Sequence, residues 1–217
     1  MRINEKKTKN LIFNFTDNYQ FMTRLSLNGQ NVEVLNSTKL LGTIVSDDLR
    51  WDLNTSNIVK KANARMELLR RVASFGTSVE EMKDVYFLFV RSLLEQSATV
   101  WHSSLTEENI SDLEWVQKSA VKIILGDKYV GYKKSLIKLE MLSLSERREQ
   151  LCLNFAQKCL KNAKTKSMFP ENKKIHSMET RNEEKYLVQY ANTERLRKSS
   201  IIYMQNLLNM NEQSKVK

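Results

Sequence analysis

The N-terminal part of the chain alternates between apolar and polar side chains, which is the pattern of short strands that bury one face. The alternation begins with Leu11 to Phe15. A second run, Arg24 to Leu27, leads into Asn28-Gly29, a strong hairpin signal because both positions tolerate positive φ. Val32 to Leu35 is expected to return antiparallel, and Lys39 to Val45 forms a further apolar strand. The pattern predicts a small antiparallel sheet.

After Trp51 the apolar spacing changes to the 3.6-residue period of amphipathic helices. The expected helix starts are Thr55 or Ser56, Ser78 in a capping box with Glu81, Thr106, Gly131, and Ser143 in a capping box with Glu146. Gly126 is expected to end the third helix. The apolar stripes of these helices can be buried only by packing on one another, so a helical bundle should follow the sheet.

The C-terminal part is less regular. Phe169-Pro170 is expected to stop the last helix of the bundle, and the polar run Glu171 to Lys185 is typical of a loop or disordered linker. Tyr186 to Asn209 regains apolar content and should dock as a strand and a short helix. Glu212 to Lys217 is expected to be a frayed tail.

Composition supports a mainly helical α+β fold. The chain of 217 residues has one Pro and five Gly, too few turn residues for a sandwich or barrel. Its formal charge of +10 and pI of about 9.5 indicate attraction to a polyanion such as nucleic acid. Acidic residues are interspersed almost everywhere, so a basic, solubilising surface is the alternative.

No stretch approaches ~18 uninterrupted apolar residues, and the N-terminus is charged where a signal peptide needs its apolar run. We therefore expect an intracellular protein, in nucleus or cytoplasm, without a membrane partner.

Cys152 and Cys159 lie about two helical turns apart, too far for a disulfide, and should be buried thiols. His102 and His176 lack neighbours at ligand spacing, so no metal site is expected.

Several motifs occur in the order and spacing of one family. They are Asn4-Glu5-Lys6-Lys7-Thr8-Lys9, Leu40-Leu41-Gly42, Leu49-Arg50-Trp51, Val100-Trp101, Leu113-Glu114 with Val116-Gln117-Lys118, and Leu144-Ser145-Glu146-Arg147-Arg148. Together they resemble the back half of a LINE-type (non-LTR) retrotransposon reverse transcriptase. The resemblance implies the end of the palm with a primer-grip-like β region at 1–52, a thumb-like bundle at 53–125, a further helical region at 126–170, and a polar linker and weakly structured tail at 171–217.

The part of that family which carries the catalytic aspartates has no counterpart in this chain. Asp47-Asp48 follows an apolar strand, but Val45 stands where the family usually has an aromatic residue, so a solvated turn is expected instead. No Gly-rich phosphate loop and no Ser-His-Asp arrangement is present. We expect no catalytic residue, metal or cofactor in this chain and no enzyme activity on its own, although the parent polymerase needs Mg²⁺.

The resemblance implies nucleic-acid contacts near the N-terminus. Asn4, Lys7 and Thr8 match a family stretch whose Lys lies near the incoming nucleotide's phosphates in a complete palm. The family's primer grip corresponds to Leu40-Leu41-Gly42, where a Gly lets phosphate approach backbone amides. The alternatives are an exposed basic end and a β-bulge. The candidate contacts are Lys6, Lys7, Lys9 and Gly42.

The helices after Trp51 resemble the thumb, which lays helices along the minor groove of the template and primer duplex. Its candidate phosphate contacts are Lys60, Lys61, Arg65, Arg70 and Arg71, although some of them merely solvate the outer face. Arg147 and Arg148 lie in the first turn of their helix, where the dipole disfavours cations. Either an external phosphate or an ion pair with Glu146 or Glu149 would explain that placement.

One segment departs from the family pattern. Where the family commonly has Arg-Pro, this chain has Arg91-Ser92 and continues to Gln96, which should lengthen the helix. Decay of an inactive copy or repurposing explains the change. The leading hypothesis is a catalytically incomplete fragment that binds RNA/DNA hybrid or duplex nucleic acid alongside a missing upstream fingers and palm region. A host-retained structural or protein-interaction domain, or a functionless decayed remnant, is the alternative.

Overall fold

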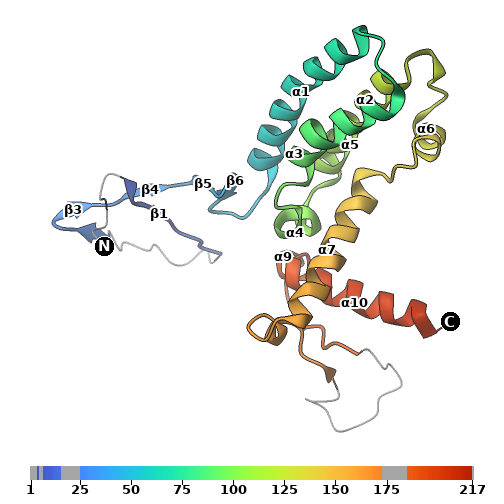
Figure 1. Ribbon diagram of the computed structural model, residues 1–217. Coiled ribbons are helices and arrows are strands. Elements are labelled where there is room, and N and C mark those ends of the chain that lie inside the picture. Colours follow the sequence, from blue (N-terminus) through green and yellow to red (C-terminus); the bar gives the residue numbers. More distant parts are fainter. Residues whose placement is uncertain (1–3, 5–6, 16–24, 173–184, 217) are drawn as a thin grey trace. The chain divides into compact units, whose positions relative to one another are not determined.

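The computed structural model describes residue 4 and residues 7–15, 25–172 and 185–216 (Figure 1). The chain divides into two units, Met1–Ile58 and Val59–Lys217. The described strands belong to the first unit, and the described helices belong to the second, apart from the start of α1 (Asp52–Ser74). This arrangement confirms the predicted fold class, a mainly helical α+β chain in which a small β region precedes the helices.

The strands of the first unit form three separate pairs. Their bounds are β1 Lys9–Leu11, β2 Ser26–Leu27, β3 Gln30–Asn31, β4 Glu33–Leu35, β5 Ser37–Leu40 and β6 Thr43–Ser46. The pairs β2–β3 and β5–β6 are antiparallel, as predicted. The pair β1–β4 is parallel, with Lys9 beside Glu33. The predicted antiparallel pairing is therefore wrong for these two strands.

Both antiparallel pairs close in two-residue turns with positive φ, the geometry that matches the twist of paired strands. Asn28 and Gly29, with φ of 49° and 82°, form the predicted turn. Leu41 and Gly42, with φ of 48° and 93°, form a second turn that was not predicted. The expected continuous strand from Lys39 to Val45 is therefore wrong, and Gly42 lies in a tight hairpin turn instead of a bulge.

The first helix begins at Asp52, earlier than the expected caps at Thr55 or Ser56. The Thr55 amide already donates to the Trp51 carbonyl at 2.8 Å, so Thr55 lies within the first turn. Asn54 fixes this start, because its buried side-chain oxygen accepts from the Ile44 amide at 3.0 Å. That bond ties β6 to the beginning of α1.

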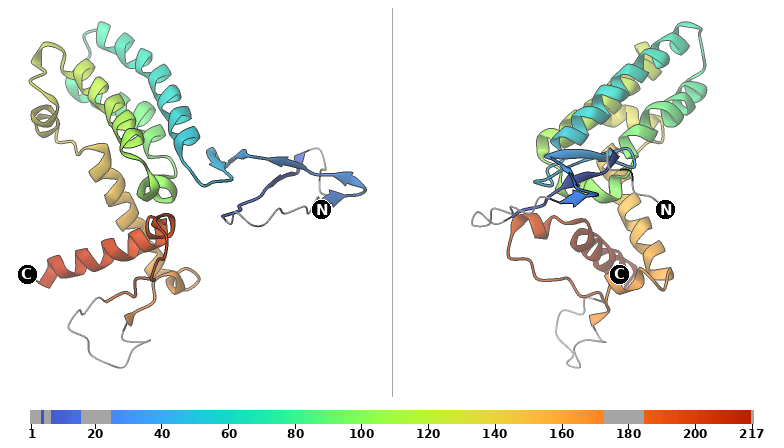
Figure 2. Two further views of the ribbon diagram at one scale, coloured as in Figure 1. Left: turned by 180° about the vertical axis from the view of Figure 1, so that it is seen from behind. Right: turned by 90° about the vertical axis from the view of Figure 1, so that its left-hand side faces the viewer.

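The second unit continues α1 and adds the remaining described helices (Figure 2). They are α2 Val79–Val85, the π-helix η2 Tyr86–Arg91, α3 Ser92–Glu95, α4 Ala98–Trp101, the 3-10 turn η3 His102–Ser104, α5 Glu107–Leu125, η4 Gly126–Lys128, α6 Tyr132–Lys138, α7 Leu144–Lys161, η5 Lys166–Met168, α9 Glu194–Arg197 and α10 Ser200–Val216. In the described ranges, no helix combines the length and apolar character that crossing a membrane requires.

Local capping explains where several of these helices begin. Both predicted capping boxes are present, Ser78 with Glu81 at α2 and Ser143 with Glu146 at α7. Thr106 caps α5 as predicted. The helical path from α2 through η2 reaches Glu95 without a break, so the predicted lengthening of this helix is confirmed.

The predicted apolar stripes bury the core of the second unit. Ala62, Met66 and Leu69 of α1 are buried, as are Leu113 and Val116 of α5. A further cluster joins α7 to α10, which lie beside each other in Figures 1 and 2. Its fully buried members are Cys152, Ala156, Cys159, Phe169, Tyr186, Met204, Leu207 and Leu208. Both cysteines are buried free thiols, as predicted.

The C-terminal elements differ from the sequence prediction. Helix α7 ends at Lys161 instead of running to Phe169-Pro170, because the chain turns back there and buries Phe169 against α7 and α10. The expected frayed tail is wrong, since α10 is helical to Val216 and docks through Leu207 and Leu208. Most of the predicted linker, residues 173–184, lies outside the described residues.

Candidate nucleic-acid interface

The five basic residues expected on the thumb-like helix lie on the solvent side of α1. Lys60, Lys61, Arg65, Arg70 and Arg71 are all exposed. The opposite side of α1 carries the buried stripe through Ala62, Met66 and Leu69. The 3.6-residue period therefore sorts cations and core residues onto different faces of one helix.

These cations differ in what they contact. Arg70 and Arg71 both pair with Glu67, at 3.4 and 3.6 Å, and exposed pairs of this kind hold a side chain only weakly. Arg65 Nη1 donates to the Phe89 carbonyl at 2.9 Å, which fastens that side chain to η2. Lys60 and Lys61 form no ion pair within the described ranges, and so they are the cations on α1 that remain available for an external anion.

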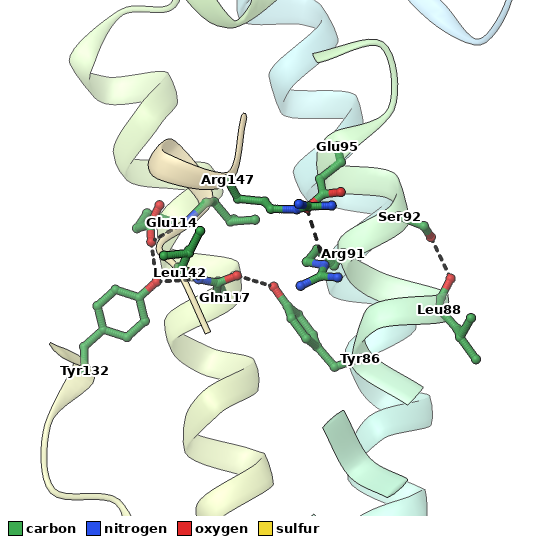
Figure 3. A network of polar contacts seen from close by, with 11 residues as sticks. Tyr86, Leu88, Arg91, Ser92, Glu95, Glu114, Gln117, Tyr132, Leu142 and Arg147 are labelled. Carbon is green, nitrogen blue, oxygen red and sulfur yellow. Dashed lines mark hydrogen bonds and ion pairs between the residues drawn. The ribbon is translucent and has the colours of Figure 1, made fainter. Parts of the chain in front are cut away.

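Arg147 is committed to an internal ion pair, although its partner was not predicted. Its Nε lies 3.1 Å from Oε1 of Glu95, and Arg91 Nε approaches the same oxygen at 3.4 Å (Figure 3). The partners that the sequence suggested for Arg147 were Glu146 and Glu149. Glu146 instead closes the capping box with Ser143, which lowers the pKa of its carboxyl through the Ser143 hydroxyl and amide hydrogen bonds.

The proposed phosphate contact at Arg148 is wrong, because this side chain is completely buried. Arg148 follows Leu144 and precedes Cys152 on the buried row of α7, so the helix carries it into the core. Its Nε donates to Nδ1 of His102 at 3.3 Å, and its guanidinium lies 5.8 Å from the Trp101 ring centre. No ligand outside the fold can reach it.

The surroundings of Arg148 favour a neutral imidazole. Burial, followed by the charge of Arg148, lowers the pKa of His102 from 6.5 to about 4. Burial also lowers the pKa of Arg148, while Glu114 and Glu95 oppose that effect. Nη1 and Nη2 of Arg148 and Oε2 of Glu114 are buried and make no hydrogen bond within the described part of the chain.

A neighbouring buried network holds α7 against α5. Tyr86 donates to Gln117 Oε1 at 2.7 Å, and Gln117 Nε2 donates to the Tyr132 hydroxyl and the Leu142 carbonyl, both at 2.9 Å. The Tyr132 hydroxyl donates to Glu114, and the Leu144 amide reaches the same carboxylate oxygen at 3.1 Å. Figure 3 shows these groups converging between the helices.

The network was not predicted from sequence, although one signal pointed to it. Gln117 is a polar residue on the buried side of α5, where its neighbours are Leu113, Val116 and Ala120. A buried amide needs partners, and the structure supplies them. Burial, above all other effects, raises the pKa of Tyr86 well above its ordinary value, so this hydroxyl keeps its proton and serves as a donor.

The candidate residues near the N-terminus belong to the first unit. Lys6 lies outside the described residues. Asn4, Lys7 and Thr8 come together in one turn, in which the Asn4 carbonyl accepts from the amides of Lys7 and Thr8, both at 3.1 Å. Lys9 forms an ion pair with Glu33 across the β1–β4 pair, so its charge is partly neutralised.

The primer-grip-like stretch lies at the end of a hairpin. Leu40 and Leu41 are 62% and 91% exposed, and Gly42 follows them in the turn between β5 and β6. A glycine in this position leaves the backbone open to close approach by another molecule. At this exposure the two leucine side chains bury little apolar area.

Asp47 and Asp48 occupy a turn that leads into α1, in agreement with the sequence interpretation. Burial would raise the pKa of Asp48, but hydrogen bonds from the Arg50 amide and the Ser46 hydroxyl outweigh it and lower that pKa. The carboxylate is therefore used locally to fix the turn. In the ranges the structure describes, no three His, Cys, Asp or Glu side chains are grouped as metal ligands.

Comparison with known proteins identifies no relative of this chain. No protein-family model, curated protein or solved structure matches this chain. The resemblance to LINE-type reverse transcriptases therefore stays a prediction carried by the motifs in the sequence.

Proposed function

We propose that this chain is a catalytically incomplete, thumb-like part of a LINE-type reverse transcriptase that binds RNA/DNA hybrid or duplex nucleic acid. The observation that carries the proposal is the exposed basic face of α1, where Lys60 and Lys61 have no acidic partner in the described part of the chain. A helix that presents several cations to solvent has the charge that a phosphate-binding surface needs.

The spacing of these cations suits the backbone of a duplex. Lys60 and Arg71 lie about three helical turns apart, which is roughly 16 Å along α1. That length runs past several phosphates of one strand, so the helix can lie along the backbone. Lysine and arginine contacts to phosphate position a duplex without reading its sequence. We expect binding with little sequence preference.

The first unit is proposed to be the end of a palm domain, the rest of which belongs to another segment. Among its described residues, the exposed large apolar side chains are Phe13, Phe15, Leu25, Val34, Leu40, Leu41 and Leu53. Exposed apolar groups in this number favour a covering partner. An upstream fingers and palm region would supply the partner and the Mg²⁺-binding aspartates, and it would return Lys7 and Gly42 to the roles that the resemblance implies. The chain alone is then expected to extend no primer.

The test is the salt dependence of binding to an RNA/DNA hybrid, measured by fluorescence anisotropy. The logarithm of the association constant should fall linearly with the logarithm of salt concentration. Replacing both Lys60→Gln and Lys61→Gln should weaken binding and reduce the magnitude of the slope by about two, because each lost phosphate contact removes about one.

The matched control replaces two exposed lysines near the end of α7, Lys161→Gln and Lys164→Gln. This variant has the same net charge as the α1 variant. It should keep the wild-type slope for the hybrid. If both variants lose affinity equally, or if neither does, the α1 face is not the binding surface. Primer extension by the purified chain would contradict the proposal that it is catalytically incomplete.

A protein-interaction domain is the second candidate, and one observation favours it. Phe75 and Leu88 of the second unit are 84% and 67% exposed, and neither is used by its core. A chain of this kind would bind a defined protein partner and would show no salt-dependent affinity for the hybrid. The anisotropy measurement therefore separates the two functions.

A further inference from the structure

Helix α5 presents a tryptophan to solvent. Trp115 is 58% exposed, whereas Trp51 and Trp101, the other two tryptophans, are 7% and 0% exposed. The buried side of α5 is already filled by Leu113, Val116 and other apolar residues, so Trp115 takes no part in that stripe. Tryptophan combines a large apolar ring with an N–H donor, which is why it is enriched at binding surfaces.

The charge on α5 changes sign along the helix. Before Trp115 it carries Glu107, Glu108, Asp112 and Glu114, and the last of these accepts a hydrogen bond from Tyr132. After Trp115 the helix carries Lys118 and Lys122, both exposed, and no acidic residue. Trp115 and Lys122 are seven residues apart, about two turns or 10 Å along the same side of the helix. The ring therefore stands at the edge of a basic surface.

A second aromatic ring lies at the basic end. Nζ of Lys122 lies 5.6 Å from the centre of the Tyr129 ring, within range of a cation–π contact. Lys128 is exposed beside it, and so is Asp127, whose charge offsets one of the three lysines. We call Trp115, Lys118, Lys122, Lys128 and Tyr129 the α5 surface. It has an aromatic ring at each end and three lysines between them, and surfaces that bind unpaired nucleotides combine these two kinds of side chain.

We propose that the α5 surface binds single-stranded nucleic acid, with an unpaired base stacked on Trp115 and phosphates paired with Lys118 and Lys122. A duplex keeps its bases stacked on each other and offers no open ring face to Trp115. An acidic peptide could pair with the lysines, but its carboxylates would not stack on the indole ring of Trp115. The proposed function concerns binding of a duplex by α1. This inference adds binding of single strands, and it depends on residues of α5 and not on those of α1.

The test is titration with oligothymidylate while tryptophan fluorescence and the anisotropy of a labelled oligonucleotide are recorded. Stacking on the exposed indole should quench its emission, and the buried Trp51 and Trp101 should be unaffected. Trp115→Ala should weaken binding about tenfold or more. Trp115→Phe should keep most of the affinity while losing the quench. Replacing both Lys118→Gln and Lys122→Gln should reduce the magnitude of the salt slope by about 1.4.

Controls separate this inference from the α1 proposal. The Lys60→Gln and Lys61→Gln double variant should keep the oligothymidylate quench even if hybrid binding is lost. Tyr190→Ala, which removes a ring that is 85% exposed outside α5, should bind like the wild type. Unchanged affinity in Trp115→Ala, with its circular dichroism also unchanged, would overturn the inference. Equal quenching by polyglutamate would overturn it too, because the surface would then recognise charge on a protein.

Discussion

At the residue scale, polar side chains on buried helix faces distinguish this fold from the pattern that predicted it. Hydrophobic periodicity locates a buried stripe from its apolar residues, so it does not detect a polar residue that is buried in the same stripe. Gln117 interrupts the stripe of α5, and Arg148 continues the row of Leu144 and Cys152 on α7. Arg148 was predicted to meet an external phosphate, or an acidic neighbour, from its charge and its position in the first turn of the helix. Its place in that row was the available signal of burial.

The buried Tyr86 hydroxyl allows a direct test of the network. Tyr86→Phe removes the donor to Gln117 and leaves a buried amide oxygen without that partner. The free energy of unfolding should fall by about 1 to 2 kcal/mol, measured by urea denaturation. Tyr190→Phe, at an 85% exposed position, should change it by less than about 0.5 kcal/mol. Equal effects at the two sites would show that the network does not stabilise the fold.

His102 should make the stability of the fold depend on pH. Its pKa is about 4 in the folded chain and about 6.5 when the chain is unfolded, so only the unfolded chain takes up a proton between these values. Unfolding is therefore favoured as pH falls through that window. Relative to His102→Gln, the wild type should lose about 2 to 3 kcal/mol between pH 7 and 4.5, measured by urea denaturation. Parallel pH profiles for the two proteins would contradict this assignment.

At the scale of the element, the β5–β6 hairpin combines an expected residue with an unexpected one. Gly42 is well suited to positive φ, but Leu41 before it is not, because its side chain crowds the backbone in this region. The sequence from Lys39 to Val45 was predicted as one strand because it is mostly apolar. The turn at Leu41 and Gly42 interrupts that run.

Leu41→Asn should stabilise this hairpin. Asparagine tolerates positive φ, and Asn-Gly is the preferred pair for the turn, while a 91% exposed Leu41 loses little burial. The free energy of opening should rise by about 0.5 to 1 kcal/mol, measured by amide hydrogen exchange in β5 and β6. Leu40→Asn, in the strand itself, should give no gain because Asn is a poor strand former. Lower protection in Leu41→Asn would show that Leu41 stabilises the turn.

At the scale of the whole molecule, the sequence predicted the fold class better than it predicted the site. The change of period after Trp51 and the capping residues Ser78 and Ser143 located the helices, because these signals are local. The exposure of Trp115 and the burial of Arg148 depend on which faces pack together, and such contacts join residues far apart in the chain. The parallel β1–β4 pair was missed for the same reason.

The two buried thiols have a practical consequence for labelling chemistry. Burial raises the pKa of Cys152 to about 11, so very little of it exists as the reactive thiolate near neutral pH, and Cys159 is shielded in the same cluster. A maleimide reagent added to the native chain should leave both unmodified. A single cysteine introduced on the solvent face of α1 could then carry a fluorophore or a photo-crosslinker selectively, with the two natural cysteines left in place.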